Sequence, residues 1–202
     1  MKKIIKPSFW HKYNGKSVIV FDNIFSQKYV EAFGIWMLGL NYQRRPSFDN
    51  ELSVGIETET YKTLPKLPQI VSKTIENYYS KMSKKRSPQK LSHLYAASVR
   101  YGDHTIIHQD IDCANCITFL YYGNIHWDSA WGGETVFFDN DKNAMFAVSP
   151  KSGRLVLFNA QLYHRTGIPM KNSSSMRYGL SIFFRCENQI HKSKNSAKPR
   201  EK

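Results

Sequence analysis

The segment Thr105-Ile106-Ile107-His108-Gln109-Asp110 is the stretch around which the rest of the chain is organised. Two apolar residues lead into His108 and Asp110, which are separated by a single residue. Because successive side chains of a strand point to opposite faces, this spacing predicts that both side chains project from one face at a strand end. An imidazole and a carboxylate held in this way are two corners of a metal site. A second histidine would complete the set of two histidines and one carboxylate that holds Fe(II) and leaves coordination positions open.

A second His-x-Asp pair, His126 and Asp128, competes for the same role. It follows Tyr121-Tyr122-Gly123-Asn124, so we expect it in a turn, where the argument from strand alternation is weaker. We therefore favour His108 and Asp110, and the second pair stays an alternative.

The third ligand should come from a later strand that lies beside the first. Gly153-Arg154-Leu155-Val156-Leu157-Phe158 is a strongly apolar run, and His164 follows it in a predicted short turn. A lone histidine is more often structural, but this one lies between a core strand and a second informative strand. We therefore predict His164 as the third metal ligand.

That second strand, Arg177 to Phe184, alternates between two kinds of side chain. Its even-numbered residues are apolar, and Arg177, Gly179 and Ser181 share the opposite face. An arginine that faces the interior of a barrel needs an anion, because a buried unpaired charge is costly. A guanidinium binds a carboxylate through two parallel hydrogen bonds, and the small neighbours leave room for one. Together with the metal residues, this favours 2-oxoglutarate as a cosubstrate over a structural ion pair.

From residue 92 onward the sequence consists of short β-type runs separated by turns. The runs cover residues 93–101, 104–109, 115–122, 134–138, 144–148, 154–158 and 177–185. Many short, evenly spaced strands are typical of a sandwich or barrel. Before them, a strand over 17–21 precedes a helix capped by Ser26, and a second helix begins near Pro68. We expect both helices to support the outside of a sheet, whereas residues 41–63 are polar and resist assignment.

The composition fits one domain of 202 residues with a sizeable core. Lys and Arg outnumber Asp and Glu by 29 to 16, so the net charge of +13 favours acidic partners or a solvated basic surface. Cys113, Cys116 and Cys186 are an odd number of cysteines, and we predict no secretory signal. We therefore expect a cytoplasmic, reducing setting, in which Cys113 and Cys116 are reduced and not catalytic. No apolar run is long enough for a membrane span.

Several motifs follow one another in a fixed order along residues 92–185. They are Arg100-Tyr101-Gly102, His108-x-Asp110, Cys116 through Asn124, Trp127, Gly132-Gly133-Glu134, Pro150-x-x-Gly153 through Phe158, His164, and Arg177 through Ser181. This order resembles the Fe(II)/2-oxoglutarate-dependent dioxygenases, and among them the prolyl hydroxylases, especially the oxygen-sensing type. The interval of 13 residues from His164 to Arg177 is longer than the family usually has, and Gly123 replaces a larger apolar residue. Both departures blur the assignment to a subfamily.

The resemblance implies a mainly β (α+β) fold, a double-stranded β-helix of the jelly-roll or cupin type with supporting N-terminal helices. It implies a single dioxygenase domain over 1–185, with its β-helix core at 92–185, followed by a basic flexible tail at 186–202. It implies Fe(II) on His108, Asp110 and His164. The cosubstrate-binding residues that it implies are Arg177, Tyr122, Tyr101, Thr118 and Ser181.

The activity that the resemblance implies is the O2-dependent hydroxylation of an unactivated C–H bond, coupled to the oxidative decarboxylation of 2-oxoglutarate. No catalytic residue beyond the metal ligands is required, and ascorbate is compatible as an additional cofactor. We expect a peptide, a protein or a free amino acid as substrate and no membrane partner. The sequence does not fix the substrate or the oligomeric state.

Two other classes of function stay open. An AlkB-like nucleic-acid demethylase would suit the positive charge, but that family places a second arginine shortly after the first. Here the next arginine is Arg185, eight residues after Arg177, so nucleic acid is not favoured. A non-catalytic basic binding module on the same fold would not need the metal residues together with Arg177.

Overall fold

The structure is a computed structural model that describes residues 5–44, 52–64, 66–82, 88–103 and 105–186. In chain order its elements are β1 (Phe9–Tyr13), β2 (Lys16–Phe21), α1 (Gln27–Leu38), β3 (Gln43–Arg44), β4 (Leu52–Gly55), α2 (Thr58–Thr63), α3 (Leu67–Met82), β5 (Gln89–Val99), β6 (Ile117–Tyr122), η1 (Ser129–Trp131), β7 (Thr135–Phe138), β8 (Ala144–Val148), β9 (Leu155–Asn159), β10 (Tyr163–Thr166) and β11 (Arg177–Cys186).

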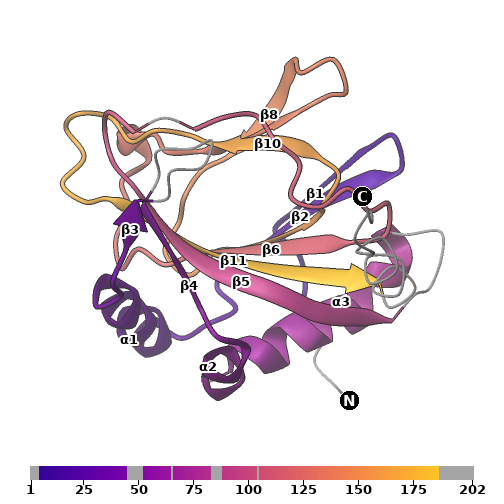
Figure 1. Cartoon of the computed structure of the whole chain (residues 1–202), viewed down its shortest axis with the longest axis horizontal. Coiled ribbons are helices and arrows are strands. Elements are labelled where there is room, and N and C mark those ends of the chain that lie inside the picture. Colours follow the sequence, from indigo (N-terminus) through magenta and orange to yellow (C-terminus); the bar gives the residue numbers. More distant parts are fainter. Residues whose placement is uncertain (1–4, 45–51, 65, 83–87, 104, 187–202) are drawn as a thin grey trace, which may run out of the picture.

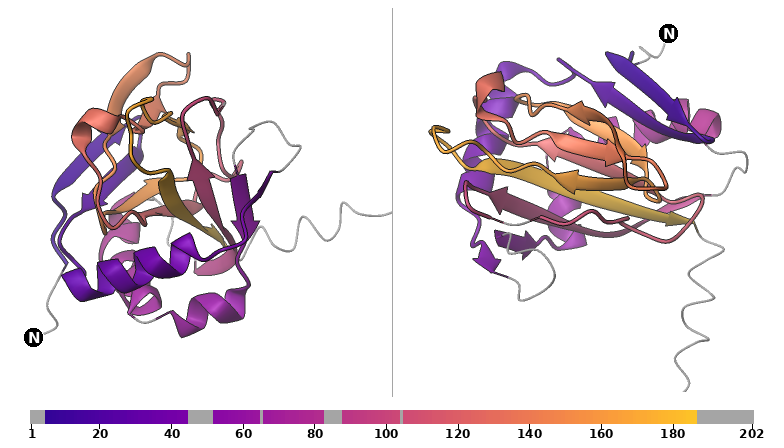
Figure 2. Two further views of the ribbon diagram at one scale, coloured as in Figure 1. Left: turned by 90° about the vertical axis from the view of Figure 1, so that its left-hand side faces the viewer. Right: turned by 90° about the horizontal axis from the view of Figure 1, so that it is seen from above.

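The strands form two antiparallel sheets. The larger has the order β1-β2-β9-β6-β11-β5-β4-β3, and the smaller has the order β10-β7-β8. In Figure 1 the smaller sheet lies across from the larger one, and the three α-helices lie on the other side of the larger sheet. The turned views in Figure 2 show the β1–β2 hairpin at one edge of the larger sheet and the helices along one of its faces. This is the predicted double-stranded β-helix with supporting N-terminal helices.

The alternation of side chains in the central strands divides the core into two layers. In β6, the side chains of Phe119 and Tyr121 join the cluster that packs against the helices. Their neighbours Leu120 and Tyr122 join the cluster between the two sheets. Because both faces of this strand are covered, all six of its residues are buried. The interior between the sheets is where the predicted site residues must meet.

The two longer helices begin where the sequence predicted. The hydroxyl of Ser26 accepts a hydrogen bond from the backbone N–H of Tyr29 and so caps α1. Helix α3 begins at Leu67, with Pro68 in its first turn, where the missing N–H of proline costs nothing. Both helices contribute their apolar faces to the cluster on the outside of the larger sheet, as predicted.

Some predictions of local structure are wrong. Within residues 105–109 the chain forms only one isolated bridge, from His108 to His164, and no regular strand; residue 104 lies outside the described part. His164 lies in strand β10 and not in a turn, because its backbone pairs with β7. Residues 41–63 supply β3, β4 and α2, apart from 45–51, which lie outside the described residues. Strand β1, which pairs with β2, was not predicted.

The expectation of reduced cysteines is also wrong for this structure, in which Cys113 and Cys116 form a disulfide. Cys186 ends β11 as a buried free thiol. The rest of the predicted basic tail, residues 187–202, lies outside the described part of the chain. Among the described helices, none is long and apolar enough to cross a membrane.

Candidate active site

The three predicted metal ligands converge between the two sheets. His108, Asp110 and His164 each place one ligand atom within 4.8 Å of the other two. The Oδ1 atom of Asp110 lies 3.5 Å from Nε2 of His108 and 3.4 Å from Nε2 of His164. Two backbone hydrogen bonds of 2.9 Å join His108 to His164, and the N–H of Asp110 donates to the carbonyl of Ala160. Backbone pairing therefore sets the spacing of the triad, although the first segment is not a regular strand.

The donor atoms of this triad suit a divalent metal ion. Nδ1 of His108 lies 3.1 Å from the carbonyl of Ile106, and Nδ1 of His164 lies 3.0 Å from the carbonyl of Leu162. Because a carbonyl only accepts, each Nδ1 must carry the proton, which leaves the lone pair of each Nε2 for a metal. Two imidazoles and one carboxylate are the donor set of non-haem Fe(II) oxygenases. The residues present therefore fit Fe(II).

The carboxylate of Asp110 is held in its charged form. Burial alone would raise its pKa, but the contacts of this carboxylate with His164, His108 and Thr118 together hold the pKa below its ordinary value. The hydroxyl of Thr118 donates to Oδ2 of Asp110 over 2.7 Å. This bond leaves Oδ1 directed at the two imidazoles. Thr118 was predicted to line the cosubstrate pocket, and in the structure its hydroxyl orients a candidate metal ligand.

Arg177 is the largest of the fully buried side chains, with 1% of its surface exposed. Its Nε donates to the carbonyl of Gly133 over 2.8 Å, and its Nη2 donates to the hydroxyl of Thr135 over 2.9 Å. Among the described residues, no carboxylate forms an ion pair with it. A buried cation without an acidic partner among the described residues is suited to bind an anion, and an arginine that requires an anion is what the sequence predicted.

A chain of hydroxyl groups connects Arg177 with Tyr122. The guanidinium carbon lies 4.9 Å from the centre of the Tyr122 ring. The Tyr122 hydroxyl lies 2.7 Å from the Thr135 hydroxyl and donates to the carbonyl of Val148 over 3.0 Å. Since the Tyr122 hydroxyl donates its hydrogen bond to the carbonyl of Val148, the Thr135 hydroxyl must donate to Tyr122. The same Thr135 oxygen accepts from Arg177. Tyr122 therefore holds Arg177 in place through its ring and through Thr135.

A small pocket opens at the metal centre. Its lining includes the three metal-binding side chains together with Thr135, Ser181 and Tyr95. Ser181 was predicted, and its backbone neighbour across the β11–β5 pair is Tyr95, which sequence reasoning missed. The structure does not bring Tyr101 to this pocket: Tyr101 follows β5 in a turn with 60% of its surface exposed. The signal for Tyr95 was the alternation of β5, which becomes informative only once its partner strand is known.

Asn124 is a further residue whose role the sequence did not reveal. Its Oδ1 accepts from the N–H of Tyr178 over 2.8 Å, and its Nδ2 donates to the carbonyl of Met176 over 2.7 Å. These two backbone groups flank Arg177, so the Asn124 amide fixes the strand on both sides of the buried guanidinium. Asn124 is the last residue of the motif Cys116 through Asn124, and the sequence alone assigned it no role.

Gly133 also makes room for the Arg177 side chain, because it has no Cβ atom. It has a φ of +77°, and a Cβ atom there would lie 3.3 Å from Cδ of Arg177 and 3.1 Å from the Trp127 ring. Glycine meets both the backbone conformation and the close approach. The Gly132-Gly133 pair was the sequence signal for this position.

The competing pair, His126 and Asp128, does not form a metal site. Asp128 caps the short helix η1 by accepting from the N–H of Ala130, and His126 is exposed with its ring edge-on to Trp131. Neither belongs to the two groups of potential metal-binding side chains within the described residues. The choice of His108 and Asp110 agrees with the geometry.

Comparisons with known proteins point the same way. Residues 95–185 match the family model described as the 2OG-Fe(II) oxygenase superfamily. The structure is similar to a prolyl hydroxylase from Trichoplax adhaerens in complex with a hypoxia inducible factor oxygen degradation domain peptide fragment. That similarity has a TM-score of 0.67 at 18% identity and covers 87% of this chain and 86% of the other. A search of curated protein sequences gives no match.

Two further similar structures are described as enzymes of different reactions. A Pseudomonas putida prolyl-4-hydroxylase has a TM-score of 0.62 at 16% identity, over 84% of this chain and 92% of the other. SnoN, a non-heme alpha ketoglutarate dependent epimerase from nogalamycin biosynthesis, has a TM-score of 0.61 at 15% identity, over 84% of this chain and 78% of the other. Residues 95–185 therefore match the 2OG-Fe(II) oxygenase superfamily, in a chain whose fold resembles that of the prolyl hydroxylases, and that superfamily implies Fe(II), 2-oxoglutarate and O2 as cofactors.

Proposed function

We propose that this domain hydroxylates an unactivated C–H bond of a peptidyl or free amino acid, most closely in the manner of a prolyl hydroxylase. The observation that carries the cosubstrate half of the proposal is Arg177. It is buried, it has no acidic partner among the described residues, and it binds Thr135, which also lines the pocket of the metal centre. A dicarboxylate with one end at the metal and the other at Arg177 would supply a ligand to the metal and an anionic partner to the arginine.

Each part of the chain has a separate task in this reaction. His108, Asp110 and His164 would hold Fe(II), which supplies the activation of O2 when bound. Thr118 keeps the Asp110 carboxylate directed at the metal. Arg177, backed by Thr135 and Tyr122, would neutralise the distal carboxylate of 2-oxoglutarate.

The substrate half of the proposal rests on likeness of fold. Two of the similar structures are prolyl hydroxylases, and one of them is a complex with a peptide. The likeness to an epimerase on the same fold means that the reaction class must be measured on this chain.

The test is to incubate the Fe(II)-loaded protein with 2-oxoglutarate, O2 and a panel of proline-containing peptides and free amino acids. Mass spectrometry should detect a product that has gained one oxygen atom, together with one succinate for each product molecule. The His108→Ala variant, treated in parallel, should give neither. An epimerised product without added oxygen would overturn hydroxylation. Demethylation of a methylated oligonucleotide, with salt-dependent binding to it, would support the demethylase instead.

A further inference from the structure

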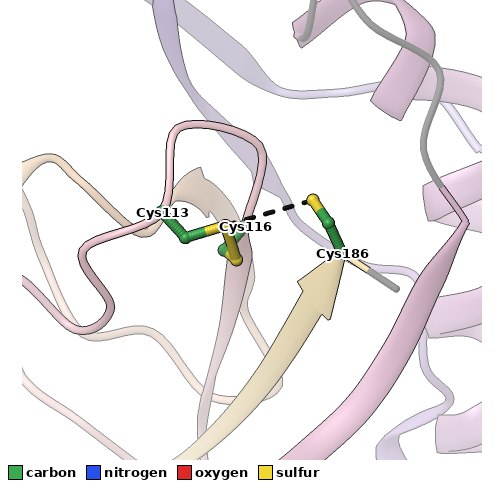
Figure 3. Close-up of side chains that lie close together, drawn as sticks. All are labelled: Cys113, Cys116 and Cys186. Atoms are coloured by element: carbon green, nitrogen blue, oxygen red, sulfur yellow. Dashed lines mark hydrogen bonds between the residues drawn. A yellow bond between two sulfur atoms is a disulfide. The ribbon is translucent and has the colours of Figure 1, made fainter. Parts of the chain in front are cut away.

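Three cysteines from distant parts of the sequence gather outside the active site. Cys113 and Cys116 lie in the segment that leads into β6, and Cys186 is the last residue of β11 (Figure 3). The three sulfur atoms all lie within 4.8 Å of one another, and those of Cys113 and Cys186 are 4.0 Å apart. The three residues are between 0% and 3% exposed. The proposed oxygenase reaction uses none of them.

The surroundings of this cluster are apolar on one side and polar on the other. Ile111 and Phe183 belong to the same buried apolar group as the three cysteines. On the polar side, Nε2 of Gln89 donates to Sγ of Cys186 over 3.3 Å, and the Tyr79 hydroxyl lies 3.9 Å from the same sulfur. Donors of this kind stabilise a metal-bound thiolate, since groups that hydrogen-bond to metal ligands orient them and tune their charge.

We propose that reduction of the Cys113–Cys116 disulfide creates a buried site for a thiophilic divalent cation such as Zn²⁺, with Cys113, Cys116 and Cys186 as its ligands. Cys-x-x-Cys spacing is common in structural zinc sites, and thiolates select soft and borderline metals. Three thiolates fill three of the four tetrahedral positions and leave the fourth to an oxygen donor. This site shares no ligand with the iron site, whose donors are nitrogen and oxygen.

The two states of the site differ by two electrons. A phosphine reductant cleaves the Cys113–Cys116 bond, takes up an oxygen atom from water and leaves two thiols. The cation then displaces the protons of the three thiols, which are released to the solvent. A two-electron oxidant such as hydrogen peroxide, which is reduced to water, restores the disulfide of this structure, removes two of the three ligands and expels the cation. The ion would connect the segment that follows Asp110 to the end of β11.

Burial favours a metal site over a site of thiol exchange with external partners. Cysteines that exchange thiols with other proteins are partly exposed, whereas buried cysteines are closed to partners of that size. Structural zinc sites, in contrast, are closed and fully coordinated. The positions of the three sulfurs in the interior, and the hydrogen bond from Gln89, therefore suit a bound cation better than a redox relay.

The experiment uses Co²⁺ as a spectroscopic substitute for Zn²⁺ in the full-length protein. Protein reduced with a phosphine should carry three titratable thiols, and the oxidised protein should carry one. Addition of Co²⁺ to the reduced protein should produce a thiolate-to-cobalt charge-transfer band in the near ultraviolet, which Zn²⁺ should abolish. Because the iron site offers no sulfur, binding there cannot produce this band. The His108→Ala variant should therefore keep it.

Two controls make the result decisive. The oxidised parent protein, which needs no substitution, should lack the band. The Cys186→Ala variant should bind Co²⁺ more weakly by more than about tenfold, since even groups that only support metal ligands contribute roughly 10–100-fold. The proposal is overturned if the reduced parent shows no charge-transfer band, if the oxidised parent shows the same band, or if Cys186→Ala binds as tightly as the parent. Loss of the band in His108→Ala would show that the cysteine site does not bind cobalt independently of the iron site and would overturn the proposal as well.

Discussion

Replacement of Arg177 by alanine is the perturbation that examines the cosubstrate pocket most closely. The guanidinium has five N–H groups, of which two are occupied by Gly133 and Thr135. Five minus two leaves three N–H groups without a partner among the described residues, which is enough for two parallel bonds to a carboxylate. The Arg177→Ala variant removes these N–H donors. It also removes the positive charge beside Thr135 that the proposal assigns to the carboxylate.

The expected magnitude follows from the number and kind of these bonds. A hydrogen bond to a charged group contributes roughly 1.5–3 kcal/mol. Because about 1.4 kcal/mol corresponds to a factor of ten in affinity, the loss of even one of the two bonds should weaken the binding of 2-oxoglutarate to Arg177→Ala by at least about 10–100-fold. Arg177→Lys should recover part of the loss, since it restores the charge but not the two-pronged geometry.

The assay is calorimetric titration of 2-oxoglutarate into anaerobic, Fe(II)-loaded protein. Fe(II) binding should survive both substitutions, because Arg177 is not a ligand. A matched control is Arg154→Ala, which removes an arginine that already has a partner: Arg154 binds both carboxylate oxygens of Asp22, at 2.8 and 3.0 Å. This control should leave the affinity for 2-oxoglutarate unchanged. If Arg177→Ala binds 2-oxoglutarate as tightly as the parent, the pocket assignment is wrong.

Substitutions at three further positions have distinct expected outcomes. Thr118→Val, which removes the hydroxyl that orients Asp110, should weaken Fe(II) binding by roughly 10–100-fold, whereas Thr118→Ser should bind nearly as the parent does; equal affinities for all three would show that the bond is dispensable. Asn124→Ala should lower the affinity for 2-oxoglutarate more than that for Fe(II), and the reverse order in titrations would refute its proposed role beside the arginine. Burial would raise the pKa of Asp22, but the hydrogen bond and charge of Arg154 hold it below its ordinary value. A depressed folded-state pKa gives stability that is present above the unfolded value of about 3.9 and is lost as the pH falls through the folded value. Asp22→Asn should therefore lower the melting temperature at neutral pH and make it less sensitive to acid, and an unchanged acid limb would contradict this.

The sequence was most informative where side-chain chemistry and strand alternation act together. The alternation of β11 placed Arg177 on the interior face and Tyr178 and Leu180 on the helix side, which is their arrangement in the structure. The convergence of His108, Asp110 and His164 was also predicted, since few residues combine an imidazole or carboxylate with a position next to a core strand. Periodicity sufficed there because each face of the strand is buried by a different layer.

The sequence was least informative where structure depends on a distant partner. Strands β3, β4 and β10 are short, and their conformation depends on the pairing of β3 with β4, of β4 with β5 and of β10 with β7. The segment before His108 reads as a strand, but it makes only a single bridge. The roles of Thr135 and Asn124 depend on hydrogen bonds to Arg177 and to its neighbours, more than 40 positions away in sequence. The proximity of Cys186 to the Cys113–Cys116 pair has the same origin.

The central claim is that His108, Asp110 and His164 hold one Fe(II). The most direct measurement is anaerobic Fe(II) titration of the oxidised protein, with succinate formation measured afterwards, in the parent and in two single variants. The parent and His126→Ala should each bind one Fe(II) and convert 2-oxoglutarate to succinate, whereas His108→Ala should bind none and produce no succinate. Iron binding and turnover in His108→Ala, with loss of both in His126→Ala, would contradict the account and move the site to His126 and Asp128.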